Sequence, residues 1–286
     1  MTPLSFGNLE TLSVSINDHI AHIQLNRPEA LNSMIAAFWR ELPQVVREID
    51  EHSAARVIVI SAVGKHFSAG MDLSVFSDMA VNFTGEPARR AERMRRLVLE
   101  LQDSFNALEQ ARMPVLVAMQ GGVIGGAVDM ICACDSRYCT EDAFFTIKET
   151  QIGMTADVGT LQRLPRLMPE GLVKEMAYTG RNMPSSEALS CSFVNRVFSD
   201  QQSMLDEVMS IAKQIAENSP MAVAGCKEML NYSRENKVNE SLNYMATWQS
   251  GLFQMPDVQE ALSAQKEQRK PTFEELHKKT RNTLAK

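Results

Sequence analysis

Apolar positions alternate along the first segments of the chain and then recur at helical spacing. Leu12–Ile16 and His19–Leu25 each alternate between apolar and polar residues, and the turn-forming pair Asn17-Asp18 separates them. This pattern predicts a β-hairpin. Ser33 then precedes apolar residues that recur at helical spacing as far as Glu51, which predicts a helix with Ser33 as its N-cap.

Two mostly apolar runs further along have the pattern of strands that are buried on both faces. They are Arg56–Ala62 and Pro114–Met119. A glycine-containing loop follows each run, at residues 63–72 and 120–126. Strand, glycine loop and helix in this order present backbone N–H groups to a ligand, so these two loops are the first candidates for a site.

The segments around these runs complete an alternation of strands and helices. Val75–Pro87 has no period and is expected to be a mobile loop, whereas Ala88–Arg112 is expected to be a long amphipathic helix with arginines on its outer face. The other expected elements are helices at Ala127–Cys134, Glu170–Thr179 and Pro184–Leu189 and a short strand at Phe193–Phe198.

The pattern changes near residue 200, beyond which the chain is expected to be helical throughout. Breaks are expected at Ser219-Pro220, Pro256 and Pro271. We therefore expect an α/β core over residues 1–200 and an all-helical C-terminal region over residues 201–286. The apolar stripes of that region exceed what one pair of helices needs, so it is expected to contact another subunit.

Composition narrows the classes of function. Of the 286 residues, 44% are hydrophobic and 22% charged, which is ordinary for a globular protein, and the net charge of −6 argues against nucleic acid as the main partner. No apolar run is long enough to span a membrane. The five cysteines indicate reduced thiols and a cytoplasmic location, and the five scattered histidines have no zinc spacing, so no metal is expected.

Three acids stand in apolar or small-residue surroundings near the second glycine loop. Asp129 lies early in the helix after that loop, and Glu149 and Asp157 follow it. Burying a carboxylate is costly unless it is paired or protonated, so such acids are candidates for chemistry. A plainer interpretation gives none of these features a role in chemistry. In it the glycines serve only packing, Asp129 only complements the helix dipole, and Glu149 and Asp157 are solvated loop acids. A dinucleotide site is disfavoured because Val123 interrupts the required glycine pattern.

Together these motifs resemble the crotonase (enoyl-CoA hydratase/isomerase) family. The resemblance covers essentially the whole chain. Its pieces are L-N-R-P-E-A-L-N at Leu25–Asn32, H-F-S-A-G-M-D-L at His66–Leu73, Q-G-G-V-I-G-G-A-V-D at Gln120–Asp129 and the segment Cys132–Phe145. A-D-V-G-T-L-Q-R-L-P-R at Ala156–Arg166 is similar to the Δ3,5-Δ2,4-dienoyl-CoA isomerase branch of the family.

The resemblance implies a fold, a substrate and a set of site residues. The fold would be a spiral of repeated ββα units with a helical C-terminal region, assembled as homotrimers or hexamers. The substrate would be an acyl-CoA thioester, with no cofactor and no metal. The backbone N–H groups of Met71 and Gly126 would form an oxyanion hole, and Ser68, Ala69, Gly70 and Asp72 would contribute with them to substrate binding. The acids of the isomerase branch match Asp129, Glu149 and Asp157.

The implied reaction moves two double bonds by proton transfer. Glu149 would act as base at C2 and Asp157 as acid at C6, while Asp129 would tune their pKa values or share the proton. Hydratases of the family have acids at the first two positions and glycine at the third, so Asp157 decides between the branches. The alternatives are a 2-enoyl-CoA hydratase that uses Asp129 and Glu149, and a non-catalytic protein of this fold that binds CoA or RNA.

Overall fold

The computed structural model describes residue 4 and residues 6–75, 84–253 and 255–279. The predicted hairpin is present: strands β1 (Leu12–Asn17) and β2 (Ile20–Leu25) pair antiparallel. The turn between them places Asp18 and His19 at positive φ, as tight hairpin turns require. From β2 onward each neighbour in the main sheet is parallel.

The main sheet has six strands in the order β1-β2-β3-β4-β6-β9. A second sheet has three strands in the order β5-β7-β8. The chain passes between the two sheets repeatedly, since β4 is followed by β5 and β6 by β7, and this alternation is the predicted spiral of ββα units. The remaining strands are β3 (Val57–Ala62), β4 (Val115–Met119), β5 (Gly122–Ile124), β6 (Ser136–Thr140), β7 (Phe144–Thr146), β8 (Met183–Pro184) and β9 (Arg196–Phe198).

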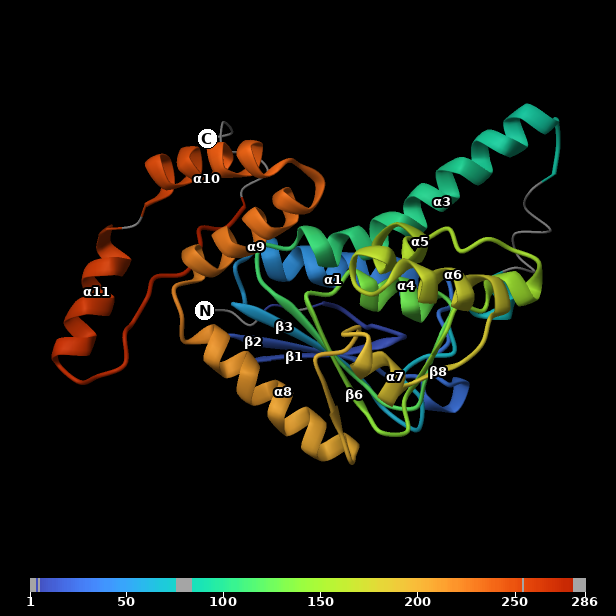
Figure 1. The fold of residues 1–286 in the computed structure, drawn as a ribbon, viewed down its shortest axis with the longest axis horizontal. Helices are drawn as coiled ribbons and strands as arrows, with labels where there is room; N and C mark the ends of the chain where they lie inside the picture. Colours follow the sequence, from blue (N-terminus) through green and yellow to red (C-terminus); the bar gives the residue numbers. More distant parts are fainter. Residues whose placement is uncertain (1–3, 5, 76–83, 254, 280–286) are drawn as a thin grey trace.

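Helices cover both faces of the main sheet, as the apolar runs predict. Ile58 and Ile60 of β3 point into the main core, which includes α1 (Phe38–Glu51), α3 (Pro87–Gln110) and α4 (Gly126–Cys132). Val57 and Val59 point into a smaller core that is closed by α8 (Gln201–Ala216). Figure 1 shows α8 on the opposite side of the strands from α1. The alternation within β3 therefore contributes to two cores at once.

Shorter helices and 3₁₀ turns connect the strands before α8. They are α5 (Thr160–Arg163), α6 (Glu170–Thr179) and α7 (Ser185–Ser190), together with the 3₁₀ turns Pro28–Ala30, Glu149–Ile152 and Leu164–Arg166. No helix of the described residues is long and apolar enough to cross a membrane.

The C-terminal helices α9 (Pro220–Glu235), α10 (Val238–Leu252) and α11 (Met255–Lys266) extend away from the sheets (Figure 1). The chain then returns as an extended C-terminal strap, residues 271–279. Arg56, at the start of β3, binds this strap: its guanidinium donates to the Glu275 carboxylate and to the carbonyl of Phe273. Further contacts join the strap to the end of α1, where Lys279 N–H donates to the carbonyl of Glu51.

Three expectations about elements need correction. The helix expected from Ser33 begins at Phe38, because Met34 pairs with the loop that carries Gly70 and Met71. The second glycine loop contains a strand, β5, where only a turn was expected. Among the residues described up to Lys279, the C-terminal region is helical only as far as Lys266. The loop expected at Val75–Pro87 lies largely outside the described residues.

Candidate active site

Two glycine loops meet where the N-terminus of α4 faces the loop after β3. Ser68 pairs with Val123 as an isolated bridge, and Ile124 N–H donates to the carbonyl of Ser68 at 3.1 Å. Gly70 has a φ of 83°, and a Cβ there would lie 2.5 Å from the carbonyl oxygen of Ile124. Only glycine permits both this conformation and this approach of the two backbones.

The loops bring the backbones of Met71 and Gly126 close together, the two residues whose N–H groups the family resemblance implies as an oxyanion hole. A Cβ built on Gly126 would lie 3.8 Å from the backbone nitrogen of Met71. Gly126 is the first residue of α4, so its N–H has no partner within the helix. Within the described residues, the N–H groups of Met71 and Gly126 donate to no backbone carbonyl. Two close, unused donors at a helix N-terminus suit an oxygen atom that carries negative charge.

Glu149 lies beside these donors. A Cβ on Gly125 would be 3.3 Å from Oε1 of Glu149, and Gly125 has a φ of 55°, which again favours glycine. Oε2 of Glu149 is buried and accepts no hydrogen bond from the described residues. Burial, and then the negative charges of Asp129 and Asp157, raise the pKa of Glu149 to about 7. A carboxylate with such a pKa suits a general base near neutral pH.

Asp129 is only 1% exposed. Its Oδ1 accepts a hydrogen bond of 2.6 Å from Thr160 N–H, yet burial outweighs this contact and raises the pKa of Asp129 to about 6. The charge of Asp157 contributes to this rise in the pKa. The N–H of Thr160 therefore links Asp129 to the segment that carries Asp157.

Asp157 lies in an irregular segment between Gly153 and α5, and its side chain is partly buried. Burial raises its pKa above the ordinary range for an aspartate. The backbone carbonyl of Asp157 accepts a hydrogen bond of 2.7 Å from Nε2 of Gln102 on α3. The electrostatic coupling of the three acids places them in one site, although they come from three separate segments.

The other residues expected to bind substrate belong to the first loop. Ser68 Oγ donates to the carbonyl of Asn32 at 2.8 Å and accepts from Gly70 N–H at 3.1 Å, so the Ser68 hydroxyl shapes the loop. Ala69 N–H donates to the carbonyl of Leu31. Hydrogen bonds from Ser33 and Ser74 lower the pKa of Asp72 to about 2. The Asp72 carboxylate is therefore ionised, and its hydrogen bonds connect the loop to Ser33.

Sequence reasoning missed the residues that support this site. Gln102 binds the backbone at Asp157, Arg163 donates from the following residues to Asn106 of α3, and Nδ1 of His66 accepts a hydrogen bond of 2.9 Å from Gly122 N–H at the start of β5. His66 and Arg163 lie within the motifs at His66–Leu73 and Ala156–Arg166, but the motifs give no signal of these contacts. A glutamine on the face of a long helix likewise gives no signal of its partner.

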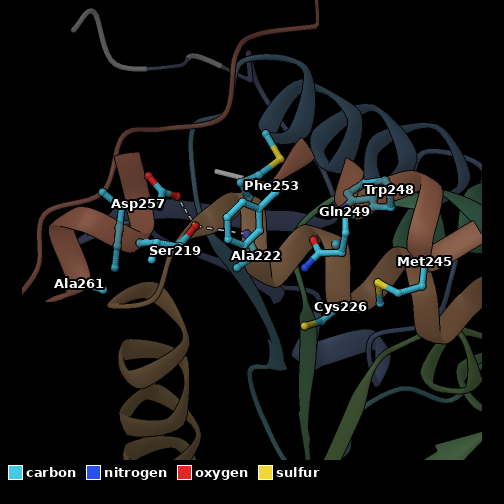
Figure 2. A pocket seen from close by; sticks show the side chains of 13 residues that line it. Ser219, Ala222, Cys226, Met245, Trp248, Gln249, Phe253, Asp257 and Ala261 are labelled. Carbon is cyan, nitrogen blue, oxygen red and sulfur yellow. Dashed lines mark hydrogen bonds between the residues drawn. The ribbon is translucent and has the colours of Figure 1, made fainter. Parts of the chain in front are cut away.

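A separate cavity of about 370 Å³ lies among α9, α10 and α11. Figure 2 shows Met245, Trp248 and Phe253 around it, and the hydrogen bond between Ser219 and Asp257 at one side. The cavity is mainly apolar and contains none of the three acids. It belongs to the C-terminal helices and not to the site of the proton chemistry.

Comparisons with known proteins give the site a context. Residues 15–278 match the family model described as enoyl-CoA hydratase/isomerase. The mouse protein named Delta(3,5)-Delta(2,4)-dienoyl-CoA isomerase, mitochondrial, is 44% identical over 93% of this chain and 82% of its own length. The Arabidopsis thaliana protein of the same name, peroxisomal, is 40% identical over 96% of this chain and 100% of its own.

A solved structure of similar fold is the enoyl-CoA hydratase from Bacillus anthracis, with a TM-score of 0.83 and 30% identity over 95% of this chain and 100% of that one. The expectation of a cytoplasmic location is wrong by these comparisons, since the mouse relative is named mitochondrial and the Arabidopsis relative peroxisomal. Reduced cysteines and a lack of apolar runs do not distinguish the cytoplasm from the interior of an organelle.

Proposed function

The chain belongs to the enoyl-CoA hydratase/isomerase family, and from this premise we propose that it is a Δ3,5-Δ2,4-dienoyl-CoA isomerase of fatty acid β-oxidation. The observation that carries the proposal is the third acid: Asp157 lies in the same electrostatic cluster as Asp129 and Glu149. Relatives that are 40% or more identical over nearly the whole chain bear the isomerase name. The substrate is an acyl-CoA thioester.

The reaction begins with stabilisation of the thioester oxygen. Removing a proton from C2 places negative charge on that oxygen, and a carboxylate is too weak a base unless the charge is stabilised. The N–H groups of Met71 and Gly126 are the proposed donors, supported by their proximity and their lack of backbone partners among the described residues. One such donor commonly contributes roughly 3–4 kcal/mol to lowering the barrier.

Proton transfer then occurs at two distant carbons. Glu149 takes the proton from C2, and the electron pair spreads over the conjugated chain to C6. Asp157 donates a proton to C6, which leaves double bonds at positions 2 and 4. One proton is removed and one is added, with no net oxidation, so the proposed reaction consumes no cofactor.

The two acids have the environments that these roles require. The raised pKa of Glu149, about 7, makes its carboxylate a stronger base than an ordinary glutamate. The raised pKa of Asp157 favours the protonated form that an acid must have. Asp129 is proposed to contribute through its charge, because it raises the pKa of Glu149.

Hydration of 2-enoyl-CoA is the second candidate, supported by the similarity to the Bacillus anthracis hydratase. Hydration needs acids around one water at C2 and C3, which Asp129 and Glu149 would supply. It gives no role to Asp157, whose partial burial is then an unexplained cost. For this reason the isomerase is the better proposal.

The test offers 3,5-dienoyl-CoA and 2-enoyl-CoA to the protein side by side. We expect isomerisation of the first to dominate, and in heavy water we expect deuterium at C6 of the 2,4-dienoyl product. Asp157→Asn should slow isomerisation by about 100- to 10,000-fold, the usual range for a general acid. Rapid hydration of 2-enoyl-CoA with no conversion of the dienoyl substrate would refute the proposal.

We also propose that the protein assembles as homotrimers or hexamers and that the helices after α8 provide subunit contacts and cover the active site. Large apolar side chains on these helices are exposed in the single chain, among them Leu230 and Leu242. Monomeric proteins rarely expose extended apolar surface, so such surface indicates a partner.

A further inference from the structure

Helix α3 carries a row of polar side chains that holds the segment around Asp157. Gln102, Asn106 and Glu109 are spaced four and three residues apart, so they lie on one face of the helix. Gln102 donates to the backbone carbonyl of Asp157 at 2.7 Å. Arg163 donates to Asn106 at 2.6 Å and to Glu109 at 2.9 Å. Two turns of α3 therefore bind one short stretch of chain, residues 157–163.

This stretch begins in irregular structure with few other attachments. Met154 N–H donates to the carbonyl of Glu149 before it, and Thr160 N–H donates to Asp129 after it. For residues 155–158, the bond from Gln102 is the one hydrogen bond that ties the backbone to another element within the described part of the chain. Ala156 and Val158, on either side of Asp157, are buried in the main core, so the single side-chain hydrogen bond from Gln102 holds the segment on the side that faces α3.

On the side that faces α3, packing does not replace that bond. A polar cavity of about 290 Å³ lies behind the segment, lined by Val158 and Gly159 on one side and by Gln102, Asn106 and Glu109 on the other. Space between α3 and the segment means that van der Waals contact alone does not fix the backbone there. A hydrogen bond across the edge of this cavity has a larger effect on position than it would have in a close-packed core.

We propose that Gln102 is a positioning residue for Asp157 and holds its carboxyl group within reach of C6 of the substrate. This inference rests on the proposed isomerase function. Gln102 binds the backbone carbonyl and not the carboxylate, so it acts through Asp157 and takes no part in proton transfer. General acids must lie within hydrogen-bond reach of the atom they protonate, and displacements near 1 Å lower rates by about 100-fold.

Arg163 braces the same segment but also acts electrostatically. A Cβ on Gly159 would lie 2.0 Å from its Nη1, so the guanidinium rests against the Gly159 backbone. Its positive charge also lowers the pKa of Asp129. Substitution of Arg163 would therefore mix two effects, whereas substitution of the uncharged Gln102 isolates position.

The test uses the fate of the intermediate. After Glu149 removes the C2 proton, the dienolate either returns to substrate by protonation at C2 or goes to product by protonation at C6. In heavy water the first path places deuterium at C2 of recovered 3,5-dienoyl-CoA, and the second yields 2,4-dienoyl-CoA. The ratio of the two rates reports the placement of Asp157 and is independent of how much enzyme is folded.

We expect Gln102→Met, which keeps the length of the side chain and removes the donor, to slow isomerisation by roughly 10- to 100-fold. Exchange at C2 and the KM should stay within about threefold, because Glu149 and the oxyanion hole do not depend on this bond. Gln102→Glu, which has the same shape and no donor when ionised, should shift the ratio the same way. Gln110→Met is the matched control, since Gln110 is an exposed glutamine on α3 that does not line this cavity.

An unchanged ratio of exchange to isomerisation in both Gln102 variants, with the wild type active, would overturn the positioning role. So would an equal loss of both rates, because that result indicates a purely structural contribution. A wild type that fails to convert 3,5-dienoyl-CoA would instead refute the proposed function, so the two failures are distinguishable.

Discussion

At the scale of residues, the proposed oxyanion hole depends on backbone N–H groups. Substitutions that keep these N–H groups should therefore affect turnover much less than a substitution that removes one. Gly126→Pro removes the N–H at the first position of α4, where proline is otherwise tolerated in a helix. We expect it to lower turnover by about 100-fold or more. Steady-state kinetics on 3,5-dienoyl-CoA would measure the effect.

Two controls keep the N–H groups. Gly126→Ala adds a Cβ whose nearest neighbour is Met34 Sδ at 3.4 Å, an ordinary contact, so it should change turnover little. Met71→Ala likewise keeps its backbone donor. If either control were as damaging as Gly126→Pro in a folded protein, backbone donation would not explain the result.

Asp129 should lower the stability of the fold at neutral pH. Below about pH 4 its carboxyl is protonated in both the folded and the unfolded chain. Between about pH 4 and 6 the unfolded chain loses this proton and the folded chain keeps it, since burial raises the folded pKa to about 6. Stability therefore falls as the pH rises through this window, by roughly 3 kcal/mol in total.

Asp129→Asn removes this penalty and still offers an oxygen to Thr160 N–H. We expect its Tm to exceed that of the wild type at pH 7.5 and to match it at pH 3.5, as measured by calorimetry. Asp72→Asn is the opposite case: hydrogen bonds lower the pKa of Asp72 to about 2, so that substitution should lower Tm at pH 7.5. A drop in Tm for Asp129→Asn at pH 7.5 would contradict the argument.

Two of the three acids proposed to carry the chemistry, Asp129 and Asp157, could be identified from the sequence because each lies in a short motif with its own local signal. Asp129 follows four glycines, and Asp157 lies in a contiguous stretch of the matching pattern. Gln102 was not accessible, since its partner is 55 residues away and its environment resembles an ordinary helix surface. A sequence reveals residues that are unusual for their local surroundings, such as a carboxylate among apolar residues. It does not reveal a residue that suits its local surroundings and has its partner far away along the chain.

At the scale of elements, the fully buried strands β3 and β4 were predicted to within one residue, whereas the largely buried strands β6 and β7 were not predicted. The start of α1 was not, because a tertiary contact of Met34 with the Gly70 loop replaces the first turn that Ser33 would have capped. Local propensity therefore predicted the helix α1 correctly, and tertiary packing determined the residue at which it begins.

The C-terminal strap should depend on one ion pair. The Arg56 side chain is only 9% exposed and binds Glu275 at 2.7 Å. Glu275→Gln leaves a largely buried guanidinium without its counter-charge. Because Glu275 itself is 30% exposed, the cost should lie between about 1 kcal/mol for an exposed pair and about 3–5 kcal/mol for a fully buried one. We expect faster proteolysis and faster hydrogen exchange within residues 271–279.

The pair Glu170 and Lys174 is the matched control for the strap. Both side chains are more than half exposed, so Glu170→Gln should change stability by less than about 0.5 kcal/mol. Equal protection of the strap in Glu275→Gln and wild type would show that other contacts, such as those of Arg112 and Lys279, suffice.

At the scale of the whole molecule, the C-terminal helices expose more apolar surface than a single chain should. Leu230, Val238 and Leu242 are each more than 60% exposed. We expect light scattering to show a trimer or a multiple of it at micromolar concentration, and Leu230→Asp with Leu242→Asp to shift it toward monomer. Leu189→Asp on α7 is the control. A wild type that is only monomeric would contradict the proposal.

The return of the C-terminal strap to β3 also has a consequence for the order of events during translation. Arg56 precedes Glu275 by 219 residues. Ribosomes add about 5–20 residues each second, so Glu275 is synthesised on the order of ten to forty seconds after Arg56. By then both sheets and α8 have left the ribosome, and the carbonyl of Ala216 is already available to Arg56. We therefore expect the two sheets and α8 to form first on the nascent chain, and the segment around Glu275 to bind to them last.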